Sequence, residues 1–128
     1  MPDSPVQFLS RDEVLAIHGR LIEVFGGPEG VRDLGLLESA LYRPQSGYYQ
    51  DLISMAAALF ESLLINHPFV DGNKRTAITA AALFMQQNGR RLQTTNEALE
   101  QFTILVVNER PSLDEIASWF RSYTDPKS

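Results

Sequence analysis

The stretch His67-Pro68-Phe69-Val70-Asp71-Gly72-Asn73-Lys74-Arg75-Thr76-Ala77 joins the end of a long apolar run to the start of another helical pattern. Backbone N–H groups at the start of a helix have no partner within the helix, so an anion can accept them. Gly72 lets the backbone approach such a ligand closely, and Lys74 and Arg75 add positive charge at the same end. Because the helix macrodipole disfavours cations there, the two cations indicate an anion between them and the helix. The stretch therefore predicts a phosphate-binding loop between two helices.

The segments on either side of this loop predict two packed helices. Residues 51–65 are apolar nearly all round, which is typical of the buried central helix of a bundle. Pro68 cannot lie inside a helix, so this helix is expected to end near Asn66. The next helix is expected over 73–87, with Asn88-Gly89 as its C-terminal stop. Phe69 is expected to pack beneath the loop and fix its shape.

Four further helices are predicted from their start signals. The starts are the capping box Ser10-x-x-Glu13, the N-cap Asp33, and the capping boxes Thr94-x-x-Glu97 and Ser112-x-x-Glu115. The first helix is expected to reach about Val24, and His18 on its apolar face is expected to be a satisfied structural group. A short extended link is expected over 90–93. The sequence thus predicts one all-α bundle of about six helices over residues 1–128, with flexible ends at 1–7 and 124–128.

Composition excludes several classes of protein. The 128 residues (14.3 kDa) suffice for one domain with a single core, and no run is long and apolar enough to span a bilayer. A net charge of −5 and a sequence pI near 4.9 argue against general nucleic-acid binding, while a local basic pocket suits a small anion. The chain has no cysteine, which excludes disulfides, and no evident secretory signal, so a cytoplasmic protein is expected.

The motif His67-Pro68-Phe69-x-Asp71-Gly72-Asn73-Lys74-Arg75 resembles that of the Fic family, and more closely that of its Doc (death-on-curing) branch. The general Fic motif reads H-P-F-x-[DE]-G-N-G-R-x-x-R, and Lys74 replaces its Gly while Ile78 replaces its last Arg. Asn-Lys-Arg-Thr-Ala before an Ala-rich helix is the Doc arrangement, and Gly26 to Leu41 upstream is also similar to Doc. The sequence departs from Doc at Gly72, where Doc has Ala, and at residues 65–66, where Doc has an Arg nearby. The resemblance covers nearly the whole chain and implies a Fic fold.

The residues of the motif suit phosphoryl transfer, which needs positioning, charge neutralisation and a base for the attacking hydroxyl. His67 is the natural base because imidazole titrates near neutral pH. Asp71 supplies a carboxylate oxygen for Mg²⁺ that bridges phosphates. The phosphates are expected to be held by Gly72, Asn73, Lys74 and Arg75. The Doc resemblance implies the same assignments, so the predicted catalytic residues are His67, Asp71, Asn73 and Arg75, with ATP and Mg²⁺ as cofactors.

Other chemistries fit the sequence less well. A conventional zinc site is disfavoured because the chain has two histidines, His18 and His67, and no cysteine. No nucleophile elbow of a serine hydrolase is present. The glycine-rich segment 26–30 lacks the preceding strand and the Lys-Ser/Thr pair of a P-loop, so it is expected to be a helix connector.

The resemblance leaves more than one activity open. Fic proteins with the full motif transfer AMP from ATP to a target hydroxyl, a pose that Lys74 and Ile78 should disturb. Doc-like proteins are kinases that transfer the γ-phosphate to a threonine of translation elongation factor Tu, which stops translation. A kinase of this kind is predicted, with an AMP transferase as the alternative. A catalytically silent binding partner is the second alternative, against which the intact motif argues.

The resemblance also implies a protein partner and a possible flap. The chain has no inhibitory [ST]-x-x-x-E-[GN] pattern, so restraint is expected from a separate, Phd-like antitoxin whose disordered tail folds into a groove. No nucleic-acid or membrane partner is expected. In Fic-like folds a flap before the central helix aligns the target peptide, which places the flap at Ser46 to Tyr49. The alternative for that segment is a connecting loop whose tyrosines cover the core.

Overall fold

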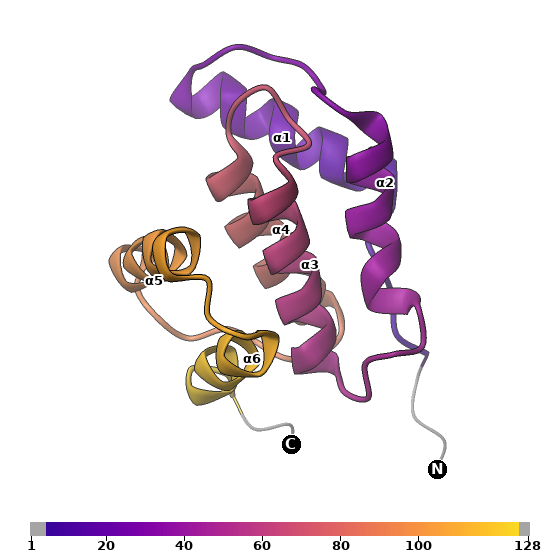
Figure 1. The fold of residues 1–128 in the computed structure, drawn as a ribbon, viewed down its shortest axis with the longest axis vertical. Helices are drawn as coiled ribbons and strands as arrows, with labels where there is room; N and C mark the ends of the chain where they lie inside the picture. Colours follow the sequence, from indigo (N-terminus) through magenta and orange to yellow (C-terminus); the bar gives the residue numbers. More distant parts are fainter. Residues whose placement is uncertain (1–4, 126–128) are drawn as a thin grey trace.

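The computed structural model describes residues 5–125, which form six α-helices and one short 3₁₀ turn (Figure 1). In chain order the elements are α1 Arg11–Phe25, α2 Leu34–Tyr42, η1 Arg43–Gln45, α3 Leu52–Asn66, α4 Asn73–Gln87, α5 Asn96–Glu109 and α6 Leu113–Ser122. Within the described residues, β-pairing is limited to two isolated bridges, Val31–Phe69 and Leu92–Thr124. The prediction of an all-α bundle of about six helices is confirmed. In this part of the chain, no helix has both the length and the apolarity that crossing a bilayer requires.

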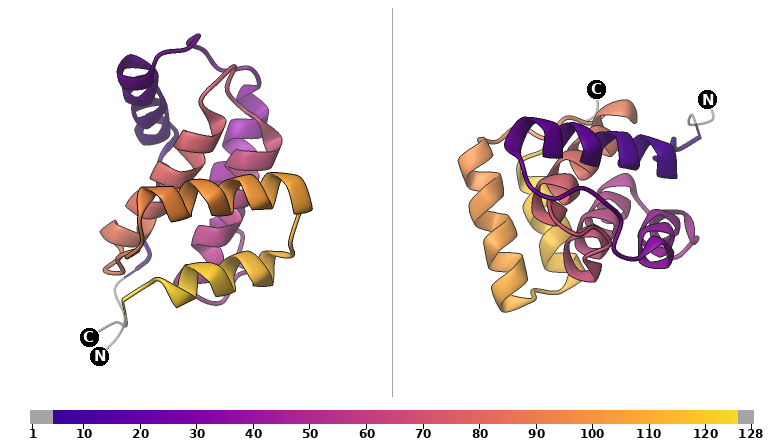
Figure 2. Two further views of the ribbon diagram at one scale, coloured as in Figure 1. Left: turned by 90° about the vertical axis from the view of Figure 1, so that its left-hand side faces the viewer. Right: turned by 90° about the horizontal axis from the view of Figure 1, so that it is seen from above.

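α3 is the buried centre of the bundle, as its all-round apolar pattern predicts. Its buried residues occupy every side of the helix: Ile53, Ala56, Ala57, Ala58, Leu59, Phe60, Ser62, Leu63 and Leu64. α4 runs beside it, and the fully buried Ala77 and Ala80 of α4 allow the two backbones to approach closely (Figure 1). α1 packs on α4 and α2 packs on α3, while α5 and α6 lie together across the pair (Figure 2). The loop between α3 and α4 lies at the end of the pair remote from α6.

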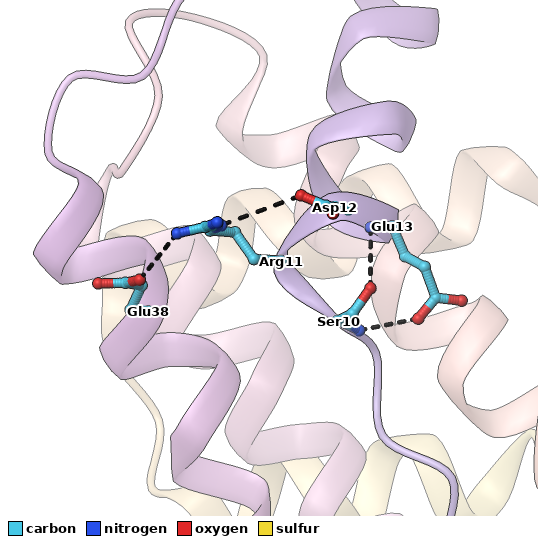
Figure 3. Close-up of polar contacts among 5 residues, drawn as sticks. All are labelled: Ser10, Arg11, Asp12, Glu13 and Glu38. Carbon is cyan, nitrogen blue, oxygen red and sulfur yellow. Dashed lines mark hydrogen bonds and ion pairs between the residues drawn. The ribbon is translucent and has the colours of Figure 1, made fainter.

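The start of α1 has the predicted capping box. The Glu13 N–H donates to the Ser10 hydroxyl at 3.1 Å, and the Ser10 N–H donates to the Glu13 carboxylate at 2.8 Å (Figure 3). Arg11 in the same turn donates to Glu38 of α2 at 3.2 Å, which ties the two helices together. An equivalent box at Ser112 begins α6. Both predictions are confirmed.

α5 begins one residue later than its predicted cap. The Ala98 N–H donates to the hydroxyl of Thr95, at 3.0 Å, rather than to that of Thr94. Ala98 is therefore the third residue of the helix, so Glu97 is not placed to reach back and complete a capping box. Two successive threonines offer the same local signal, and the sequence pattern selected the wrong one.

Two segments that were expected to be flexible make hydrogen bonds at their inner edges. The Gln7 N–H donates to the Asn88 side-chain oxygen at 2.8 Å. The Gln93 N–H donates to the Tyr123 carbonyl at 2.6 Å, so the extended link pairs with the chain around Thr124. These hydrogen bonds do not measure mobility, so flexibility at residues 5–7 and 124–125 stays a prediction. The outer parts of the two segments, residues 1–4 and 126–128, lie outside the described residues.

Ser46–Tyr49 is a connecting loop, and the prediction of a flap there is wrong. The segment precedes the first turn of α3, whereas His67 follows the last, and α3 is about 22 Å long at 1.5 Å per residue. Arg43 donates to the Tyr49 hydroxyl at 2.6 Å and to Glu61 on α3 at 2.8 Å. Partial burial disfavours the charge of Arg43, but these bonds to Glu61 and Tyr49 outweigh it and raise its pKa. Arg43 therefore holds η1 against α3, and Tyr49 of the loop supports Arg43 through its hydroxyl.

Candidate functional site

The predicted phosphate-binding loop is a sharp connection between α3 and α4. α3 ends at Asn66, and the next residue, His67, takes a left-handed conformation (φ 51°, ψ 57°). Gly72 is left-handed as well (φ 79°, ψ 15°), and α4 begins directly after it. A left-handed residue costs little at glycine but is uncommon for histidine, so other contacts must stabilise the turn at His67.

The side chain of Asn73 closes the loop from within. Its amide oxygen accepts the Phe69 N–H at 3.0 Å, and its amide nitrogen donates to the Phe69 carbonyl at 3.0 Å. Asn73 is 8% exposed and Phe69 is 1% exposed, so water has little access to these bonds. Phe69 is thus the anchor that the sequence predicted. The Asn73 amide, predicted to bind phosphate, is used in this structure to shape the loop.

Residues 30–33 lie along the other side of the loop. Arg32 donates through Nε to the His67 carbonyl at 2.6 Å and through Nη2 to the Asn66 carbonyl at 2.8 Å. The backbone N–H groups of Arg32 and Asp33 both donate to the Pro68 carbonyl, and the Val70 N–H donates to the Gly30 carbonyl. Arg32 thereby satisfies carbonyl groups that a helix end leaves without partners. Sequence reasoning assigned Arg32 no role, although it lies in the upstream segment similar to Doc.

Asp71 is exposed and is held by contacts on several sides. Its Oδ1 accepts the Gly72 N–H at 2.8 Å, and its carbonyl oxygen accepts a bond from Nε2 of His18 at 2.7 Å. Gly27 lies so close that a Cβ there would be 2.7 Å from Asp71 Oδ2. No group of three or more histidine or acidic side chains suited to a metal occurs within residues 5–125. A single carboxylate fits Mg²⁺, which commonly takes one or two carboxylates together with phosphates and waters.

α4 differs from the other α-helices of residues 5–125 in having no side-chain cap. The starts of the other five are each capped by a side chain: Ser10, Asp33, Asp51, Thr95 and Ser112. At α4 the cap position is Gly72, and the Asn73 side chain is turned to Phe69 instead. The first turn also has no acidic residue, while Lys74 and Arg75 are exposed there. This helix start has the properties of an anion-binding site.

A groove next to this helix start lies between α1, α4 and α5. Its volume is about 300 Å³, and Phe25, Arg75 and Ile78 are among the residues that line it. The Arg75 guanidinium lies over the Phe25 ring, with Cζ 4.2 Å from the ring centre. Arg75 is thus stacked at the groove, while the loop lies at the helix start. Ile78, in place of the last Arg of the general Fic motif, makes the groove less polar.

The structure brings the predicted site residues together at one end of α3 and α4. His67, Asp71, Lys74 and Arg75 are exposed there, and Gly72 and Asn73 shape the backbone between them. Sequence reasoning missed Arg32 and Gly27, because their roles depend on the packing of residues 26–33 against the loop. It placed His18 correctly as a satisfied group but did not identify its partner.

Comparison with known proteins identifies the family of this chain. A model of the Fic/DOC family matches residues 8–85, which include the loop, α3 and most of α4. The chain belongs to the Fic/DOC family. It is 46% identical over 91 residues to Toxin Doc of Mycolicibacterium smegmatis, an alignment that covers 67% of this chain and 68% of that protein. It is 30% identical over 120 residues to Protein kinase doc of Escherichia phage P1, covering 91% and 94% of the two chains.

Proposed function

We propose that this protein is a Doc-type toxin that transfers the γ-phosphate of ATP to a threonine hydroxyl of elongation factor Tu and thereby inhibits translation. The observation that carries the proposal is the start of α4, a helix N-terminus without a side-chain cap, flanked by Lys74 and Arg75 and by the exposed His67 and Asp71. Two relatives support the class of activity, since one is named a toxin and the other a protein kinase.

Each residue has a definite role in this proposal. His67 accepts the proton of the target hydroxyl. The hydroxyl oxygen forms a bond to the γ-phosphorus, the bond from that phosphorus to ADP breaks, and ADP leaves. Asp71 would hold Mg²⁺, which offsets phosphate charge when Mg-ATP is bound. The N–H groups at the start of α4, with Lys74 and Arg75, orient the phosphates. Asn73 acts by shaping the loop, through its two bonds to Phe69.

The alternative activity is AMP transfer, which the residue Gly72 favours because the general Fic motif has Gly at this position. The local backbone offers a separate reason for glycine there. Gly72 has φ 79°, and a Cβ would lie 3.3 Å from Cδ1 of Ile22. Since this conformation favours glycine whatever the reaction, Gly72 is weak evidence for AMP transfer. Lys74 and Ile78 then weigh toward phosphoryl transfer. The second alternative, a silent binding partner, is disfavoured by the exposure of an intact His67 and Asp71.

The proposal includes a partner and a compartment. An antitoxin supplied as a separate, Phd-like protein restrains the toxin, because the sequence has no inhibitory [ST]-x-x-x-E-[GN] helix of its own. The cytoplasm is the proposed location, since elongation factor Tu acts there. No nucleic acid or membrane takes part.

Intact mass spectrometry of elongation factor Tu, after incubation with this protein and Mg-ATP, tests the proposal. We expect the gain of one phosphoryl group, and no gain with His67→Ala, whose fold is checked by circular dichroism. His67 is exposed, so its truncation should leave the helices intact. The gain of one adenylyl group would instead establish AMP transfer. An unmodified factor, with wild-type protein that is folded, would refute elongation factor Tu as the target.

A further inference from the structure

His18 is a buried histidine on α1 that contacts the loop at two places. Its Nε2 lies 2.7 Å from the carbonyl oxygen of Asp71, a residue 53 positions further along the chain. Its ring stacks on the Phe69 ring, with 3.8 Å between the ring centres and 6° between the planes. Only 5% of His18 is exposed. One side chain from α1 therefore contacts both the anchor of the loop and the residue proposed to hold Mg²⁺.

The bond to Asp71 shows that a particular nitrogen of the His18 ring bears a proton. A carbonyl oxygen can only accept a hydrogen bond, so Nε2 must bear the proton and donate it. The donor faces the peptide group between Asp71 and Gly72, and the next atoms along the chain are the Gly72 N–H and its partner, Asp71 Oδ1, at 2.8 Å. Rotation of that peptide would break the bond to His18 and also move the N–H away from the carboxylate.

Side chains of α1 and the backbone at Gly27 leave little space around this peptide. A Cβ on Gly72 would lie 3.5 Å from His18 Nε2 and 3.3 Å from Ile22 Cδ1, and a Cβ on Gly27 would lie 2.7 Å from Asp71 Oδ2. Glycine at position 72 allows the left-handed turn, but it also leaves the peptide free to rotate, because glycine has many accessible backbone conformations. The His18 N–H supplies the restraint that glycine lacks.

We propose that His18 is a positioning residue, whose Nε2–H holds the Asp71–Gly72 peptide so that the Asp71 carboxylate is oriented to bind a divalent cation. The inference rests on the proposed function for the role of the cation, but the positioning of the peptide does not depend on which group is transferred. His18 contacts neither the target hydroxyl nor the phosphates in this proposal. It acts through Asp71.

Two substitutions test the N–H donor and the aromatic ring of His18 independently. His18→Phe keeps an aromatic ring against Phe69 but has no N–H to donate. His18→Gln has an N–H donor near the same place but no ring. Ile116→Val is the control, because it truncates a buried side chain of α6, at the other end of α3 from the loop (Figure 1).

The first measurement is the hydrogen exchange of the Gly72 amide by nuclear magnetic resonance, in protein without nucleotide or metal. We expect His18→Phe to lower the protection of this amide about tenfold, while His18→Gln retains most of it. The second is the binding of Mn²⁺ in the presence of a non-hydrolysable ATP analogue, followed by electron paramagnetic resonance. Loss of a partner that orients a metal ligand typically weakens binding by about 10-fold or more, so the Phe variant should bind Mn²⁺ about 10-fold less tightly.

Each outcome supports or refutes the positioning role proposed for His18. Wild-type exchange and wild-type Mn²⁺ affinity in His18→Phe would overturn it, as would equal losses in the Phe and Gln variants, because the ring and not the donor would then matter. Equal losses in Ile116→Val would also overturn it, since a general loss of stability would explain them. Because the exchange measurement needs no substrate, metal or nucleotide, a failure to find phosphoryl transfer would refute the proposed function and leave this result standing.

Discussion

Asn73→Ala is expected to destabilise the protein strongly, although Asn73 was predicted from the sequence to act on phosphate. The substitution removes two hydrogen bonds of 3.0 Å and leaves the N–H and carbonyl of Phe69 without partners. Phe69 is 1% exposed, so water is poorly placed to replace Asn73. A buried backbone group without a partner costs about 1–3 kcal/mol.

The size of the effect follows from these two groups. Taking the lower half of that range for each gives about 2–4 kcal/mol, because the loop can adjust to let some water in. Alanine has a higher helix propensity than asparagine, which offsets about 0.5 kcal/mol of this destabilisation. The net loss is therefore about 1.5–3.5 kcal/mol in the free energy of unfolding, or about 6–14 °C in Tm for a domain of this size.

Urea unfolding followed by far-ultraviolet circular dichroism measures this loss. Asn96→Ala is the matched control, because Asn96 is the first residue of α5, as Asn73 is of α4, but its side chain is exposed. The control should change the free energy of unfolding by less than about 0.5 kcal/mol. If Asn73→Ala were as stable as wild type, or if both variants lost the same amount, the loop would not depend on the Asn73 amide and the reasoning would be refuted.

Two further predictions concern Gly27 and Glu115. Gly27→Ala should reduce the free energy of unfolding by about 1–3 kcal/mol and should also reduce phosphoryl transfer, because Gly27 has φ 114° and its new Cβ would meet Asp71 Oδ2. The control Gly47→Ala, which has φ 90° but open space around its Cβ, should keep full transfer. Equal losses of activity in the two variants would contradict this prediction. Backbone and side-chain hydrogen bonds from Ser112 lower the pKa of Glu115, so its contribution is present above the unfolded-state pKa of about 4.3 and is lost as the pH falls through the folded-state value. The free energy of unfolding, measured with urea, should therefore fall less between about pH 7 and about pH 3 in Glu115→Gln than in wild type. An equal fall in the two proteins would contradict the capping role.

The sequence predicted the helices well because their signals are local. Ser10 and Ser112 each stand three residues before a glutamate, and both capping boxes form where that spacing places them. The apolar run of α3 and the proline after it gave both the burial and the end of the central helix. The error at Thr94 has a local cause too, since Thr95 offers the same hydroxyl one residue later.

The contacts that hold the loop were not predictable in the same way. His18, Gly27 and Arg32 reach the loop across more than 30 residues of sequence, and no spacing rule links an α1 histidine to the Asp71 carbonyl. The flap was misplaced for the same reason. Position before the central helix suggested Ser46–Tyr49, but the packing of α2 brings residues 30–33 to the loop and leaves 46–49 at the other end.

Exposure divides the candidate site into two kinds of residue. His67, Lys74 and Arg75 are exposed, and the functions proposed for them need contact with substrate. Asn73 and His18 are buried, and their bonds are made to backbone groups of the loop. A variant of the first kind should therefore lose activity without losing stability, whereas a variant of the second kind should alter the loop even when no substrate is present. Asp71 belongs to both kinds, because its carbonyl is held from the interior by His18 while its carboxylate lies at the surface. Its orientation is thus the point at which the packing of α1 can influence the chemistry at the start of α4.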